Sequence, residues 1–177
     1  VWGEYLGGTT SSMRFHVGVM AQDGSGMRDL AWAGDIRDDV LDLGAGYGAV
    51  KAALASTGAR VLAVERDPRS LARLRRRFAG NPRVTVIDAD LLDVPVPRRV
   101  FAVVANIPFS TTTALVHRLL DPPRSRLSSA ALVVAEGAAM GLVTAARGSG
   151  RGAWWGARYD LHRGRRIPRT AFNPAPS

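Results

Sequence analysis

The sequence contains no cysteine at any of its 177 positions. Disulfide bonds, thiolate metal sites and a cysteine nucleophile are therefore excluded together. No apolar run reaches the length of about 18 residues that spans a bilayer, and the first twenty residues lack the basic-then-apolar pattern of a secretory signal. Three histidines are present at scattered positions: His16, His117 and His162. We therefore expect a soluble, cytoplasmic, monomeric protein with no membrane partner and no bound metal.

Lysine is nearly absent as well, because Lys51 is the only one and arginine carries nearly every positive charge. A GC-rich genome explains this ratio, but it does not explain the net charge of +9, which favours a polyanionic partner. Residues 137–177 contain seven arginines and one acid, and residues 66–77 hold a second arginine cluster. A solvated helix face explains the second cluster as well as nucleic-acid contact does. The arginines that we expect to contact nucleic acid are Arg73, Arg76, Arg163, Arg165 and Arg166.

Short apolar runs alternate with helical patterns along residues 40–147, in a chain long enough for one domain and too short for two. We expect strands and helices in alternation: strands over residues 40–43, 60–64, 84–87, 100–105 and 127–135, and helices over residues 50–56, 68–78, 111–120 and 137–147. Outside this region we expect a helix near residues 27–33, a flexible loop from Gly148 and a last strand pair over residues 154–167. This alternation predicts βαβ units in a doubly wound, mostly parallel sheet of the Rossmann-like α/β class.

Glycines follow the first of these strands, where the chain turns into the first helix. Gly44 and Gly46 let the backbone turn sharply and approach a ligand closely, although this spacing also fits a dinucleotide-binding turn. Glu65 follows the second strand, where a carboxylate can accept ribose hydroxyls. Asp90 follows the third strand, where it can accept an adenine amino group, although a loop acid or helix cap explains it equally well. Because the carboxyl ends of parallel strands meet at one edge, the set predicts a crevice for an adenosine-containing ligand, NAD or S-adenosyl-L-methionine.

The fourth strand runs directly into residues 106–109, which read Asn-Ile-Pro-Phe. An adenine amino nitrogen is a poor nucleophile because its lone pair is delocalised into the ring, so a site that methylates it must accept hydrogen bonds from its protons. The Asn106 carboxamide and the Ile107 carbonyl can accept them, and Phe109 offers a face for stacking an extracted base, typically worth about 1–3 kcal/mol. The alternative is a strand end followed by a proline turn with a core Phe. At the end of the fourth strand, the segment favours methylation of an exocyclic amine.

Four segments together resemble the ribosomal RNA adenine dimethylases, the family of the Erm macrolide-resistance methyltransferases and the KsgA-type small-subunit enzymes: residues 41–46, 64–67, 90–92 and 106–112. The resemblance covers about residues 38–176, and residues 165–176 look like the run that follows the family's last strands. It implies S-adenosyl-L-methionine as cofactor, held by Gly44, Gly46, Glu65, Asp90, Leu91 and Asn106. It also implies a site for the target base formed by Asn106, Ile107 and Phe109.

Two features depart from the family pattern. Members carry an N-terminal segment that closes over the cofactor, and here residues 14–17 lie at roughly the right distance before the first strand, which makes His16 a candidate cofactor-binding residue. We therefore assign residues 1–37 to an N-terminal cofactor-closing segment and residues 38–177 to the catalytic domain. Members also continue into a helical C-terminal RNA-binding domain, which we expect to be absent here.

The Asn-Ile-Pro-Phe form followed by threonines looks more like the Erm branch. The resemblance therefore implies N6 methylation of an adenine in 23S rather than 16S ribosomal RNA, with resistance to macrolides, lincosamides and streptogramins. The alternatives are a KsgA-type small-subunit dimethylase and a non-catalytic nucleic-acid binder on the same fold. A nicotinamide oxidoreductase is disfavoured, because no proton donor is evident near Asn106.

Overall fold

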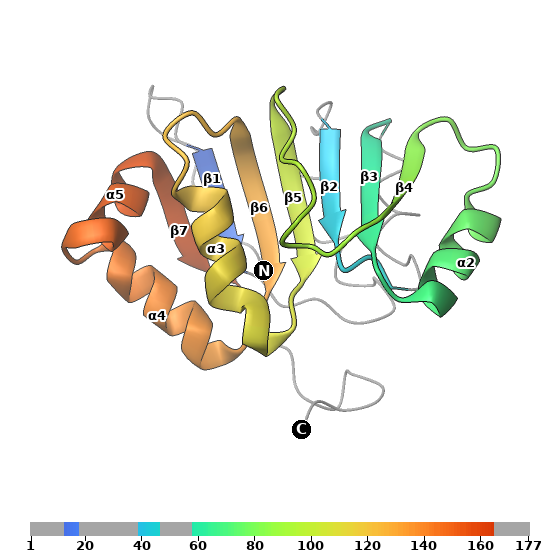
Figure 1. Cartoon of the computed structure of the whole chain (residues 1–177). Coiled ribbons are helices and arrows are strands. Elements are labelled where there is room, and N and C mark those ends of the chain that lie inside the picture. The colour runs from blue at the N-terminus through green and yellow to red at the C-terminus, as the bar shows by residue number, and fades with distance from the viewer. Residues whose placement is uncertain (1–12, 18–38, 47–57, 165–177) are drawn as a thin grey trace.

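The computed structural model describes residues 13–17, 39–46 and 58–164, which form one sheet with helices beside it (Figure 1). The sheet has seven strands in the spatial order β4-β3-β2-β5-β6-β1-β7, and every pair of neighbours is parallel. The strands are β1 (Met13–Val17), β2 (Asp39–Leu43), β3 (Arg60–Glu65), β4 (Val84–Asp88), β5 (Phe101–Asn106), β6 (Leu127–Val133) and β7 (Tyr159–Arg163). The expected Rossmann-like parallel fold is confirmed.

The centre of the sheet is formed by β2 and β5, whose side chains are almost all buried. A parallel strand covered on both faces reads as a continuous apolar run, which is why these strands were visible in the sequence. Helix α3 (Thr112–Leu120) lies across the face of the sheet that is turned to the viewer in Figure 1. It packs Leu115 and Leu119 into the same core as Phe101 and Leu132.

Helix α2 (Pro68–Arg77) begins directly after β3, as expected. The Asp67 side chain accepts a hydrogen bond of 2.7 Å from the backbone N–H of Ser70, and this bond holds the pKa of Asp67 below its usual value. The buried positions of the helix are Ser70, Leu71 and Leu74, while its arginines point outward. A proline in the first turn, a capping acid and a short apolar stripe therefore suffice to place this helix from the sequence.

The chain after Gly148 differs from the expectation, because Gly150–Arg158 forms helix α5. The predicted loop and the predicted strand over residues 154–158 are wrong, although β7 follows within the predicted range. The physical reason is the contact with helix α4 (Glu136–Ala146): a Cβ on Gly152 would stand 2.1 Å from the carbonyl oxygen of Ala145. Gly156 is as close to Ala146. These glycines let two helix backbones approach, which the sequence alone does not distinguish from a loop.

Trp155 connects α5 to the end of α3. Its indole N–H donates to Asp121 at 2.8 Å, and the ring of His117 packs edge-on against it at 5.2 Å. Burial alone would raise the pKa of Asp121, but hydrogen bonds from Trp155 and His117 outweigh it and hold the pKa below its usual value. Trp155 thus ties α5 to the end of α3 through the carboxylate of Asp121.

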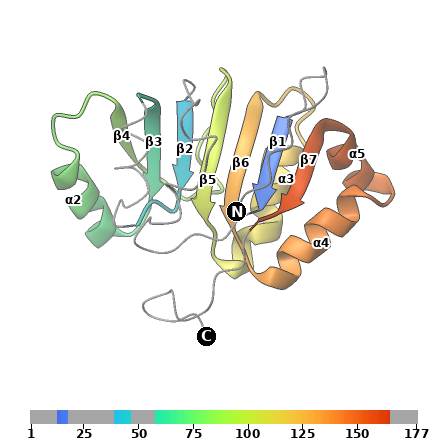
Figure 2. The same cartoon turned by 180° about the vertical axis from the view of Figure 1, so that it is seen from behind.

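The N-terminal strand β1 was not expected. It lies between β6 and β7 and runs parallel to both, with His16 opposite Ala131 on one side and His162 on the other (Figure 2). The pairing is entirely long-range, so no local pattern announces it. The helices expected near residues 27–33 and over residues 50–56 lie outside the described residues. Within the described ranges, no helix is long and apolar enough to cross a membrane, and no group of three or more His, Cys, Asp or Glu could hold a metal ion.

Candidate active site

The turn after β2 is built on two glycines with left-handed backbone conformations. Gly44 has φ of 71° and Gly46 has φ of 49°, values that residues with a Cβ adopt only with strain. The backbone N–H groups of Gly44 and Ala45 both donate to the carbonyl of Val64, each at 3.0 Å. The turn is therefore attached to the end of the neighbouring strand β3, and glycine is required for its shape.

Glu65 links this turn to the start of α2. One carboxylate oxygen accepts from the backbone N–H of Gly46 at 2.8 Å, and the other accepts from those of Arg66 and Asp67 at 2.8 and 2.9 Å. A carboxylate offers about four lone-pair positions, so these donors leave room for roughly one further hydrogen bond. Two features that the sequence predicted separately, the glycine turn and the acid, are thus one connected unit. A ribose that binds Glu65 with both hydroxyls must displace or share one of these N–H groups.

Asp90 lies one strand further out, beyond the end of β4. Its Oδ1 accepts from the backbone N–H of Leu92 at 2.9 Å, and its Oδ2 accepts from the guanidinium of Arg66 at 2.7 Å. The Leu92 hydrogen bond is the main cause that lowers the pKa of Asp90, and the Arg66 bond and charge add to it. The carboxyl group therefore stays an ionised acceptor to lower pH than an ordinary aspartate. An adenine amino group at Oδ2 would compete with Arg66.

Arg66 is a further residue at this edge, and in the sequence it stands out only as part of a basic cluster and of the family-like segment 64–67. Its guanidinium reaches from the β3–α2 corner to the loop after β4 and bonds Asp90 in this structure. The one signal that could have found it is its place directly after Glu65, at the same sheet edge. It is exposed, so its contact with Asp90 can open without disturbing the core.

Asn106 ends β5 and lies beside the glycine turn. The contact is close, because a Cβ placed on Gly44 would stand 3.2 Å from the backbone oxygen of Asn106. On the other side, Asn106 lies in register with Val133 of β6, whose carbonyl accepts from the Ile107 N–H at 3.1 Å. Ile107 is buried, while the Asn106 side chain is exposed at the edge. The backbone of this segment is thus held by both neighbouring strands, with the carboxamide left at the surface.

Two threonines hold the turn that follows. The carbonyl of Pro108 accepts from the Thr111 N–H and hydroxyl, each at 3.0 Å, and from the Thr112 hydroxyl at 3.4 Å. These bonds fix the chain between β5 and the short helix η3 (Phe109–Thr111), which continues into α3. In the sequence these threonines stand out only as part of the family-like segment 106–112. Their position shows that they orient the backbone just after Asn106.

The structure brings five of the predicted site residues to one edge of the sheet, the carboxyl ends of β2, β3, β4 and β5: Gly44, Gly46, Glu65, Asp90 and Asn106. Leu91 is half-buried and packs against the core beside them. His16 lies apart from β2, in β1, with β5 and β6 between the two strands. Its role, like that of the aromatic ring of Phe109, stays a prediction.

The arginines expected to contact nucleic acid are not gathered at this edge. Arg73 and Arg76 are exposed on α2, and Arg163 at the end of β7 approaches the sulfur of Met140 at 3.3 Å. Arg165 and Arg166 lie outside the described residues. The structure therefore places Arg73 and Arg76 on the helix that packs beside β4, and Arg163 on β7, the outer strand on the other side of the sheet.

Comparison with known proteins gives concordant matches. Residues 35–177 match the family model described as ribosomal RNA adenine dimethylase. The chain is 33% identical over 141 residues to an rRNA adenine N-6-methyltransferase of Bacillus licheniformis, covering 80% of this chain and 49% of that protein. It is 37% identical over 148 residues to the mycinamicin-resistance protein MyrB of Micromonospora griseorubida, covering 78% of this chain and 43% of that protein. The chain thus spans about half the length of these curated relatives.

Among solved structures, the crystal structure of the 23S rRNA methyltransferase ErmE is similar, with a TM-score of 0.55 and 28% sequence identity. The similarity covers 68% of this chain and 49% of that one. The region that the family model matches, residues 35–177, includes every strand except β1, and so contains the carboxyl edge described above.

Proposed function

The chain belongs to the ribosomal RNA adenine dimethylase family, and from this premise we propose that it transfers a methyl group from S-adenosyl-L-methionine to the N6 amino group of an adenine in 23S ribosomal RNA. The observation that carries the proposal is the placement of Asn106 against the Gly44 turn, in the same row as Glu65 and Asp90. Asn106, an acceptor for an amino group, therefore lies next to the residues that we expect to bind an adenosine-containing ligand.

The residues at this edge fit the cofactor. A Cβ at Gly44 would stand 3.2 Å from the Asn106 carbonyl oxygen, so the close approach of the turn to Asn106 needs a glycine there. Glu65 has acceptor capacity for the ribose, and Asp90 is an ionised acceptor suited to the adenine amino group. The bound cofactor supplies an electrophilic methyl group on a cationic sulfur. No general base is required, because the proton displaced from the amino group can leave to solvent.

Asn106 acts on the target base in this proposal. Its carboxamide oxygen accepts a hydrogen bond from the adenine amino group, which draws the nitrogen lone pair out of conjugation and orients it. The hydrogen bonds of Thr111 and Thr112 to the Pro108 carbonyl hold the backbone on which this acceptor stands. Such positioning matters for the rate, since a displacement of about 1 Å can cost about 100-fold.

Two of the chain's matches support the choice of 23S RNA, although other relatives are small-subunit methyltransferases. One relative is a mycinamicin-resistance protein and a similar structure is a 23S rRNA methyltransferase. The Asn-Ile-Pro-Phe segment followed by threonines agrees with the Erm branch, and the net charge of +9 suits an RNA substrate. On this proposal the protein works in the cytoplasm, and methylation of the adenine confers macrolide, lincosamide and streptogramin resistance.

The proposal is tested by incubating the protein with radiolabelled S-adenosyl-L-methionine and deproteinised 23S or 16S RNA. We expect label in the 23S RNA, recovered as N6-methylated adenosine after digestion to nucleosides. Label in the 16S RNA alone would contradict the choice of substrate and favour a small-subunit enzyme. Label in neither RNA would contradict methyltransferase activity of this chain.

Replacing Gly44 with alanine is expected to weaken binding of S-adenosylhomocysteine at least about tenfold. The added Cβ costs about 1–2 kcal/mol of left-handed backbone strain and also meets the Asn106 carbonyl at 3.2 Å. Gly80→Ala is the matched control, because Gly80 has φ of 78° with nothing within 4 Å of the added atom. Calorimetric titration of both variants checks this. Equal affinity in the two variants would contradict a role of Gly44 in binding the cofactor.

A further inference from the structure

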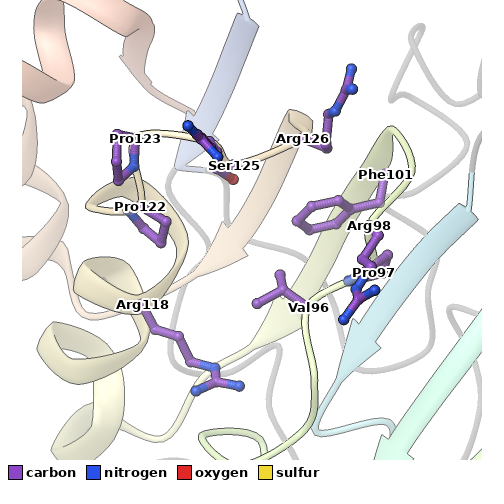
Figure 3. Close-up of a pocket in the computed structure, with 10 residues that line it drawn as sticks. Val96, Pro97, Arg98, Phe101, Arg118, Pro122, Pro123, Ser125 and Arg126 are labelled. Atoms are coloured by element: carbon purple, nitrogen blue, oxygen red, sulfur yellow. The ribbon is translucent and has the colours of Figure 1, made fainter.

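A pocket with an arginine rim opens at the edge of the sheet opposite the candidate active site. It has a volume of about 460 Å³ and lies between residues 96–98, the first residue of β5, the end of α3 and residues 122–126 (Figure 3). Figure 3 shows Val96 and Phe101 between Arg118 on one side and Arg98 on the other. Phe101 begins β5 and Leu127 begins β6, so the pocket stands at the amino ends of the central strands.

The charge of this pocket is of one sign. Its lining includes four arginines and no acid: Arg98, Arg118, Arg124 and Arg126. Within the part of the chain that the structure describes, none of the four forms an ion pair with a carboxylate. Asp121, the nearest acid along the chain to Arg118 and Arg124, is committed to Trp155 and His117. The positive charge of the pocket is therefore available to a ligand.

The walls of the pocket are held in place by the protein itself. Arg118 donates to the carbonyl of Val94, which ties α3 to the loop that precedes β5. Arg158 of α5 donates to the carbonyls of Pro122 and Pro123 at 2.9 and 3.2 Å, which fixes the turn before Arg124. Phe101 is completely buried and closes the floor. Because these hydrogen bonds hold the walls before a ligand binds, binding costs less conformational entropy.

We propose that this pocket binds the phosphate backbone of the RNA substrate at a second site, remote from the target adenine. This inference rests on the proposed function. Guanidinium groups pair with phosphate oxygens in a planar, two-bond geometry, and an apolar floor admits the sugar beside them. Phe101 at the pocket and Asn106 are five residues apart in β5, which places them about 17 Å apart through the core of the protein. The RNA must pass around the domain and advances about 3.4 Å per nucleotide, so the contacted phosphate lies at least about five nucleotides from the methylated base.

The test compares two double variants that remove equal charge. Arg98→Gln with Arg124→Gln removes two exposed arginines from the pocket, and Arg75→Gln with Arg147→Gln removes two exposed arginines from α2 and the end of α4. Binding is measured by fluorescence anisotropy at several salt concentrations. The two probes are a long deproteinised 23S RNA fragment that the wild type methylates and the same fragment trimmed to about three nucleotides on each side of its target adenine.

We expect the pocket variant to bind the long fragment about tenfold more weakly and to lower the slope of log affinity against log salt concentration by about 1.4, since each phosphate contact contributes about 0.7. The control variant should keep the wild-type slope, and neither variant should change binding of the short fragment or the thermal midpoint. Equal slopes in the two variants would overturn the proposal. Unchanged affinity for RNA in both variants would also overturn it, and would point to an acidic protein as the partner of the pocket.

The proposed function can fail separately. If the wild type methylates no RNA, the binding series is run with an unstructured RNA of the same length. A slope that falls only in the pocket variant would then support the phosphate contact while contradicting the activity. Methylation with equal slopes in all three proteins would overturn the pocket alone.

Discussion

Replacing Asn106 with alanine is expected to lower the rate of adenine methylation at least about 100-fold while leaving the fold intact. The change removes the carboxamide acceptor that orients the amino nitrogen, and the loss falls in kcat because the interaction matters most when the nitrogen attacks. Stability should change little, since the Asn106 side chain is exposed and the backbone of the segment is held by β2 and β6. Single-turnover rates with labelled cofactor and 23S RNA measure the effect.

Two companion variants sharpen this result. Asn106→Asp keeps an acceptor of the same size and should retain more activity than Asn106→Ala. Asn81→Ala removes an asparagine from the loop before β4, where it accepts from the Arg83 N–H at 3.0 Å, and should leave the rate unchanged. Full activity in Asn106→Ala would contradict the assigned role. Full biological effect together with no methylation in the wild type would instead identify a non-catalytic nucleic-acid binder.

Replacing Gly152 with alanine is expected to destabilise the protein by about 1–3 kcal/mol or more. The new Cβ would stand 2.1 Å from the Ala145 carbonyl oxygen and 2.5 Å from its carbonyl carbon, so α5 must move away from α4. That movement would disturb Trp155 and its hydrogen bond to Asp121. A thermal scan should show the midpoint lowered by roughly 2–4 °C per kcal/mol.

A glycine-to-alanine substitution in α4 is expected to stabilise the protein instead. Gly137 and Gly141 lie in α4 with nothing within 4 Å of an added Cβ. Gly141→Ala should therefore stabilise the protein by up to about 1 kcal/mol, because alanine is the better helix former. If Gly152→Ala proved as stable as Gly141→Ala, the close packing of α4 on α5 would be wrong.

Local patterns predicted most of the elements on which the site stands. Val40 to Leu43 and Val100 to Ala105 read as buried strands because both faces of a parallel sheet are covered, and Pro68 marked the start of α2. The positions of Glu65 and Asp90 followed from one rule, that successive parallel strands end at the same edge. Their meeting with Gly46 and Arg66 did not follow, since it depends on side-chain hydrogen bonds that no spacing encodes.

The misses have a common cause. Strand β1 pairs only with strands far along the chain, and α5 exists because Gly152 and Gly156 fit against α4. The roles of Thr111 and Thr112 depend on a carbonyl that the turn brings back to them. The arginine pocket joins residues from a loop, a helix and a turn that are not neighbours in sequence. In each case the deciding partner is distant in the chain or brought close only by a turn.

The sequence by itself determined the class of fold, the row of Gly44, Glu65, Asp90 and Asn106, and the kind of chemistry that an acceptor at Asn106 favours. Each of these depends on local backbone preference or on the chemistry of one side chain. Both are properties of the residue itself and do not depend on its distant neighbours. Only the tertiary structure decided that Glu65 already accepts from the Gly46 N–H, that Arg66 bonds Asp90, and that four arginines line one pocket at the amino ends of the central strands. Those facts are set by distances across the fold, and such distances exist only once the core has brought the strands and helices together.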